Sequence, residues 1–157
     1  MPERSESQGA TQSRGATQAK RKARSATEPS GEVLAGISSG MVRLYREHFG
    51  KGPTKAKTYA LDDLVICVMR DGLSPAERTL YEAGRASTVR EMRAAYLDAV
   101  ADSFNSVVER LTGRKVVAFM SQTNVGPDLV IEVFFLDGGV GEHGTLETDG
   151  DGDHVWD

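Results

Sequence analysis

Apolar and polar positions alternate in regular patterns only between residues 30 and 137. The first pattern begins after Ser30, a residue type that can cap a helix, and its apolar side chains recur every three to four positions up to Phe49. Gly50 then allows a left-handed helix end, and Pro53 prevents the helix from resuming. The spacing therefore predicts a first helix that ends at Phe49.

The next pattern has the period of a β-hairpin. In Thr54–Leu61, small or polar residues alternate with longer ones, as in a half-exposed strand. Asp62 and Asp63 form the turn, and Leu64–Met69 is a continuous apolar, β-branched run. We expect the second strand of this hairpin to be the more buried one.

Two helices are predicted after the hairpin. Ser74-Pro75-Ala76-Glu77 has the sequence of a capping box with proline at the first helical position, and the short helix that it begins stops at Gly84. A long helix follows from about Ser87 to Leu111, and Gly113 ends it. Its predicted buried stripe comprises Val89, Met92, Tyr96, Ala99, Val100, Ser103, Phe104, Val107 and Leu111.

A second hairpin ends the patterned region, with strands at Lys115–Gln122 and Leu129–Leu136 and a turn at 124–127. The predicted fold is therefore α+β, in the order α-β-β-α-α-β-β, with a four-stranded antiparallel sheet packed by helices. Without the short helix, this order is that of a ferredoxin-like chain whose first strand has moved to the end. In that arrangement the second and fourth strands are central, and Thr54–Leu61 lies at an edge.

Composition divides the chain into three parts. Residues 1–29 contain six Lys or Arg, three Asp or Glu and no Leu, Ile, Val or aromatic residue, which predicts a disordered basic tail. Residues 138–157 alternate Gly with Asp and Glu, which predicts a disordered acidic tail. The domain at 30–137 is close to neutral, so nucleic acid is an unlikely partner.

Several classes of protein are excluded or disfavoured by the composition. No apolar run reaches the about 18 residues that a membrane span requires, so we expect no membrane insertion, and the polar N-terminus is not a signal peptide. Cys67 is the only cysteine, which excludes an intramolecular disulfide and favours a reducing, cytoplasmic location. We expect no cofactor and no bound metal.

The strongest candidate binding site is the loop at 50–57. Gly52 frees the backbone to present N–H groups, and Lys51, Lys55 and Lys57, with Thr54 among them, favour an anion such as phosphate or a carboxylate. The loop lacks the order of a P-loop and leaves a helix C-terminus, where the dipole disfavours anions. The alternative is a helix stop followed by an edge strand whose lysines prevent edge-to-edge pairing.

Glu132 is the second candidate, because it lies in an apolar strand. It shares a face with Val130, Phe134 and Leu136, whereas the opposite face is apolar throughout, which suggests that both sides are covered. A glutamate there needs a partner such as an arginine, so we expect an interface or an internal ion pair. No Ser/His/Asp or Cys/His set occurs in the domain, so no catalytic residue is assigned and an enzyme is not expected.

Five strings, in this order, resemble a bacterial family named after MpsC, formerly a domain of unknown function: GKGPTKAKTY at 50–59, LDDLV at 61–65, GLSPAERTL at 72–80, LTGRKVVAFM at 111–120 and DLVIEVFF at 128–135. The family name refers to a Na⁺-translocating, membrane-potential-generating system. The resemblance implies a soluble accessory to such a system, because a chain without a membrane segment cannot itself move an ion across a bilayer. It supplies no catalytic residues.

Two functions are therefore open. The first is a non-enzymatic accessory or regulatory protein that acts through protein–protein contacts, forms a homodimer through a sheet edge or an uncovered sheet face, and contacts a subunit of a membrane-transport system. The second is a module that binds a phosphate ligand or nucleic acid through the Lys51, Lys55 and Lys57 loop. A small enzyme is the least favoured alternative.

Overall fold

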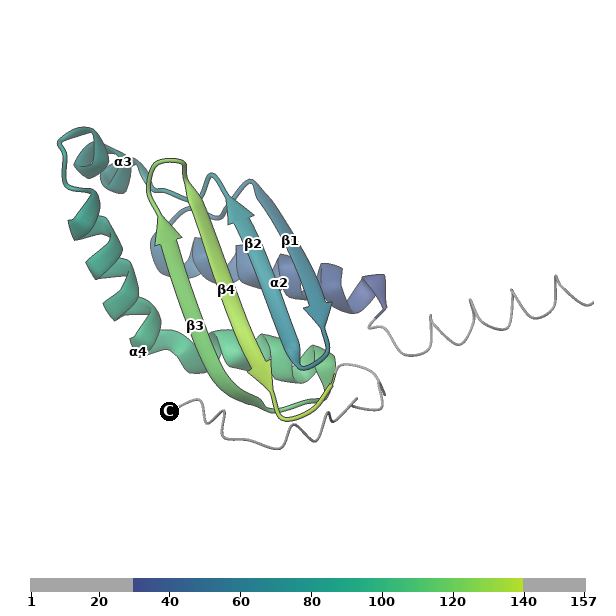
Figure 1. Cartoon of the computed structure of the whole chain (residues 1–157). Coiled ribbons are helices and arrows are strands. Elements are labelled where there is room, and N and C mark those ends of the chain that lie inside the picture. The colour runs from purple at the N-terminus through teal and green to yellow at the C-terminus, as the bar shows by residue number, and fades with distance from the viewer. Residues whose placement is uncertain (1–29, 140–157) are drawn as a thin grey trace, which may run out of the picture.

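A computed structural model describes residues 30–139 (Figure 1). Seven elements follow one another in the predicted order, α-β-β-α-α-β-β. Their bounds are α2 Gly31–Phe49, β1 Lys55–Leu61, β2 Leu64–Arg70, α3 Pro75–Glu82, α4 Ala86–Thr112, β3 Val116–Asn124 and β4 Leu129–Leu136. The predicted disorder at 1–29 and in most of 138–157 lies outside the described residues.

The helix ends lie where the capping residues predict. The Ser30 hydroxyl accepts a hydrogen bond from the N–H of Val33 at 3.3 Å and begins α2. Gly50 and Gly113 end α2 and α4 with φ values of 77° and 69°, which a residue with a side chain adopts only at a cost. At α3, Ser74 and Glu77 form both hydrogen bonds of the capping box.

The four strands form one antiparallel sheet in the order β1-β2-β4-β3. The second and fourth strands are therefore central, and β1 lies at an edge, as the permuted ferredoxin-like arrangement predicts. Strand β4, the last of the four in sequence, lies between β2 of the first hairpin and β3 of its own hairpin. Backbone hydrogen bonds consequently join the two hairpins into one sheet.

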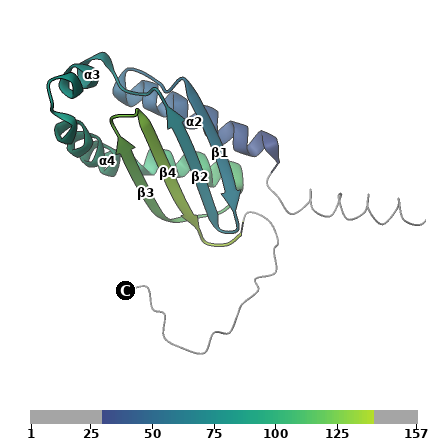
Figure 2. The same ribbon diagram turned by 45° about the horizontal axis from the view of Figure 1, so that its top comes forward.

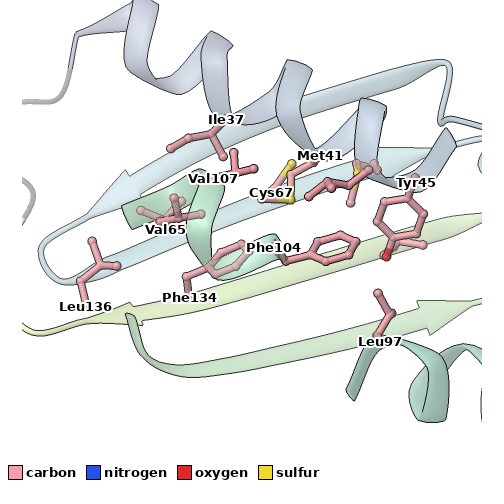
Figure 3. Close-up of a cluster of buried hydrophobic side chains, with 14 residues drawn as sticks. Ile37, Met41, Tyr45, Val65, Cys67, Leu97, Phe104, Val107, Phe134 and Leu136 are labelled. Carbon is pink, nitrogen blue, oxygen red and sulfur yellow. The ribbon is translucent and has the colours of Figure 1, made fainter. Parts of the chain in front are cut away.

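Helices α2 and α4 pack on one face of this sheet, and no described helix covers the other (Figures 1 and 2). The core lies between these layers, as Figure 3 shows for part of it. It comprises Ile37, Met41, Leu44, Tyr45, Val65, Cys67, Met69, Leu97, Phe104, Val107, Val108, Val130, Phe134 and Leu136. A smaller cluster of Leu73, Val89 and Val125 lies beside α3.

The predicted stripe of α4 was right at Val89, which is buried, but wrong at Met92, Tyr96, Ala99 and Ser103, which are exposed. Met92 and Tyr96 are 40% and 38% exposed, whereas Arg93 and Leu97 are buried. Arg93 and Leu97 take the inward positions on these turns of the helix, and the Arg93 guanidinium is paired there with Glu77. Downstream, Phe104 and Val107 are buried as predicted.

Candidate functional site

Glu132 lies on the helix-facing side of β4 and is fully buried. The Tyr45 hydroxyl from α2 donates a short hydrogen bond to Oε1 of this carboxylate, and Ser121 Oγ on β3 donates another at 3.0 Å. The other oxygen, Oε2, has no hydrogen-bond partner among residues 30–139. The direct partners are thus two hydroxyls, and the arginine suggested as a partner does not contact Glu132.

The nearest buried cation is Arg93, which was not identified from the sequence. Its guanidinium carbon lies 4.6 Å from the centre of the Phe49 ring and 5.6 Å from that of Tyr45. Its Nη2 donates to Glu77 Oε2 at 2.6 Å and to the backbone oxygen of Gly72 at 2.9 Å. Arg93 therefore forms the internal ion pair of this domain with the glutamate of the capping box.

Burial raises the pKa of Glu132 to about 7, while the hydrogen bonds from Tyr45 and Ser121 and the charge of Arg93 act in the opposite direction. Burial and the adjacent carboxylate raise the pKa of Tyr45 far above its usual range, so its hydroxyl remains a donor. Both side chains are 0% exposed, so a ligand outside the domain does not reach them. The pair is a polar element of the core.

The lysine loop does not converge on one point. Thr54 Oγ1 donates to Asp71 Oδ2 at 2.9 Å, so this hydroxyl is already engaged within the domain. Lys55 and Lys57, two positions apart on β1, both lie on the face away from the helices. Lys57 Nζ lies 5.1 Å from the centre of the Tyr59 ring. Lys51 and Gly52 lie in the loop after α2, half-buried. Glu132 points to the opposite side of the sheet from Lys55 and Lys57.

The face of the sheet away from the helices is apolar over most of its area. The strand register places Tyr59, Ile66, Val133 and Met120 side by side in one row across all four strands. The next row toward the β1–β2 turn is Leu61, Leu64, Phe135 and Ala118. On the other side of the first row lie Lys57, Val68, Ile131 and Gln122. We call these twelve residues the open face.

Exposure on the open face is high for such side chains. Leu61 and Met120 are 64% and 57% exposed, and Tyr59 and Ile131 are 48% and 41% exposed. Four strands of seven to nine residues span about 19 Å by 25 Å, so this is a patch of several hundred Å². Contiguous apolar patches of that size mark interaction sites in soluble proteins. Within residues 30–139, the prediction that both sides of β4 are covered therefore holds for one side only.

Charge is distributed toward the two ends of the open face. Lys55 and Arg70 are paired in register at one end, and Asp62 and Asp63 form the β1–β2 turn at the other. Asp62 adopts a φ of 51°, consistent with the predicted turn role of these aspartates. In the part of the chain that the structure describes, no group of three or more His, Cys, Asp or Glu could hold a metal ion.

Comparison with known proteins gives the family. Residues 30–138 match the family described as Na⁺-translocating membrane potential-generating system (MpsC). The chain belongs to the MpsC family. It is also similar to the uncharacterized protein YbcI of Bacillus subtilis (strain 168), with 22% identity over 90 residues, 57% of this chain and 73% of that protein. No solved structure matches the chain.

The MpsC match covers all seven elements, so the open face and the buried Glu132 pair both belong to the family domain, and most of each tail lies outside it. Family membership suggests a role connected with Na⁺ translocation or membrane potential. Among the helices of the described region, none combines the length and the apolar character that a bilayer crossing needs.

Proposed function

We propose that this chain is a soluble, cytoplasmic, non-enzymatic accessory or regulatory protein of a Na⁺-translocating, membrane-potential-generating system, and that it acts through protein–protein contacts. The open face is the observation that carries the proposal. A partner that removes its exposed Leu, Met, Ile and Tyr side chains from water lowers the free energy of the complex. The buried polar side chains of Tyr45 and Glu132, and of Arg93 and Glu77, form pairs inside the domain and leave the open face as its largest exposed feature.

The first partner that we propose is a second copy of the chain, stacked open face to open face as a homodimer. A two-fold axis between the sheets and perpendicular to the strands would reverse the strand direction in the partner. Lys55 and Arg70 of one copy would then lie over the Asp62–Asp63 turn of the other, while the apolar rows pack at the centre. A transport-system subunit would be bound by the remaining surface of this dimer.

Light scattering on the full chain tests the assembly. We expect a dimer that Met120→Glu dissociates, because the substitution places a charge in the centre of the open face. Met92→Glu is the matched control, since Met92 is 40% exposed on α4, outside the open face. A monomer at all concentrations, or equal dissociation by both variants, would contradict the homodimer.

Co-purification with the membrane fraction tests the functional link. Tagged full chain, expressed at its natural level, is expected to retain subunits of a cation-transport system, and Met120→Glu is expected to change that retention more than Met92→Glu. Retention of no transport subunit by the unaltered chain would contradict the link to the transport system while leaving the dimer to be judged by light scattering.

A second candidate function is the binding of a phosphate ligand at the basic edge of β1. It is favoured by one observation: Lys51, Lys55 and Lys57 form no ion pair with an acid within residues 30–139. Titration with inorganic phosphate and with labelled RNA at two salt concentrations tests it, because phosphate contacts weaken as salt rises. Binding that is insensitive to salt or to Lys55→Gln would contradict this function.

A further inference from the structure

A second surface, independent of the open face, lies between helix α2 and the edge strand β1. A hollow of about 300 Å³ opens there, lined by Ser38, Ser39, Val42, Arg43, Arg46 and Ala56. We call it the α2–β1 groove. Its lining contains two guanidinium groups, two hydroxyls and no acid.

The arginines of the groove have little competing charge. Arg43 lies 4.0 Å from Glu47, but both side chains are more than half exposed, so water and salt weaken this pair. Arg46 forms no ion pair with any described residue. On the other side of β1, Lys55 and Lys57 are exposed as well. Cations therefore flank the edge strand on both faces.

The same edge also offers backbone hydrogen-bonding groups. Because β1 pairs with no strand but β2 among residues 30–139, alternate N–H and C=O groups of β1 point away from the described sheet. A groove between a helix and a free strand edge is a surface on which an extended peptide binds, with alternate side chains directed into the groove. The charge of this groove selects an acidic peptide.

We infer that the α2–β1 groove binds an extended acidic peptide and that its occupant is the chain's own segment 140–157. This segment contains six acidic residues and no Lys or Arg. Glu147, Asp149, Asp151 and Asp153 occupy every second position, so an extended backbone places all four carboxylates on one side. Arg43 and Arg46, three positions apart, present two cations on one side of α2.

The chain is long enough for this contact. The described residues end at Gly139, just after Leu136, whose N–H donates to the backbone oxygen of Asp63 in the β1–β2 turn at 2.8 Å. The eight residues from there to Glu147 reach up to about 27 Å. The free edge of β1 lies three strand spacings from β4, about 14 Å, and Ala56 lies about 17 Å back along β1, so the direct distance is about 22 Å. The acidic segment would therefore run antiparallel to β1 along its free edge.

Amide NMR spectra of the full chain test the inference. The variant Glu147→Gln/Asp149→Asn/Asp151→Asn/Asp153→Asn neutralises the segment without altering any described residue. We expect its amide shifts to differ from those of the unaltered chain at residues 38–46 and 55–60. The differences should be independent of protein concentration and should disappear in 1 M NaCl, where charges are screened beyond about 3 Å.

Arginine variants show whether the groove is responsible. In Arg43→Glu/Arg46→Glu, neutralising the segment should no longer shift these amides, whereas it should still do so in Arg78→Glu/Arg90→Glu. Arg78 and Arg90 are the matched controls because both are exposed, on α3 and α4, away from the groove.

Three results would overturn the inference: no shift difference at all, differences that grow with concentration and so report a second copy, or shifts produced by inorganic phosphate but not by neutralisation. The open-face dimer is judged separately, because Met120→Glu should leave these shift differences unchanged.

Discussion

The hydroxyl of Tyr45 on α2 is hydrogen-bonded to the carboxylate of Glu132 on β4, 87 positions later in the chain, inside the buried core. This contact joins the first helix to a central strand. The Arg93 guanidinium lies against the Tyr45 ring and is in turn bonded to Glu77. Polar groups from α2, α3, α4 and β4 are therefore held together under the sheet.

Tyr45→Phe should lower the free energy of unfolding by about 1–3 kcal/mol at pH 8, because it leaves a buried carboxylate with Ser121 as its remaining donor. Urea denaturation measures the change. Tyr96→Phe is the matched control: its hydroxyl makes an exposed contact with His48 at 3.3 Å, and its removal should cost less than about 0.5 kcal/mol. Equal costs for both variants would contradict the role of the buried contact.

Glu132 should make stability depend on pH. Its pKa is raised from 4.5 to about 7 in the folded state, so the folded chain binds more protons than the unfolded chain between these values. The stability contribution is therefore full below about pH 4.5 and is lost as pH rises to about 7, by an amount on the order of 3 kcal/mol.

Urea denaturation of the unaltered chain and Glu132→Gln between pH 4.5 and 8 measures this loss. The amide of the variant does not titrate, so the difference in stability between the two proteins should change across this range in favour of Glu132→Gln. A constant difference would show that the Glu132 carboxyl does not carry the pH dependence.

Arg93→Ala should lower the free energy of unfolding by about 3–5 kcal/mol, because it leaves Glu77 buried without its cation. Arg90→Ala, at an exposed position one turn earlier on α4, should change it by less than about 0.5 kcal/mol. Thermal unfolding of the two variants side by side provides the comparison. If both variants lower the free energy of unfolding by a similar amount, the buried ion pair does not stabilise the domain more than an exposed arginine does.

Gly40→Ala should destabilise the domain by about 1–3 kcal/mol although alanine favours helix, because the added Cβ would lie 2.6 Å from Cγ1 of Val107 where α2 crosses α4. The β-branched valine has little freedom to move aside. Gly31→Ala, where the Cβ meets no atom within 4 Å, should be neutral or stabilising. Greater stability of Gly40→Ala in urea would contradict this close approach.

The element order, the helix ends and the two central strands could be predicted from the sequence because each depends on local signals: a capping residue, a glycine, or the length of an apolar run. Glu132 could be recognised as unusual for the same reason. Its partner Tyr45 could not be identified, because that contact depends on how α2 crosses β4. Periodicity gives the spacing of a buried stripe but not which long side chain an ion pair draws inward, and so Arg93 was missed.

The sequence predicted that both faces of β4 are apolar, but it could not show which face the helices cover. An apolar strand pattern has the same sequence whether a helix, a partner or water lies beside it. Ile131 and Met120 show this ambiguity, because their apolar side chains lie on the face of the sheet that no described helix covers. The α2–β1 groove had no sequence signal, because its two sides come from a helix and a strand that meet only in the folded chain.

The position of β4 determines when the sheet can form during synthesis of the chain. Of the four described strands, β4 is synthesised last, yet it is the strand that joins β3 to the β1–β2 hairpin. A ribosome-bound chain that has not yet released residues 129–136 can form helices and the first hairpin but not the sheet, and Glu132 does not yet meet Tyr45. The sheet therefore forms only after residues 129–136 have left the ribosome, and a truncation before Leu129 removes the centre of the domain and not its margin.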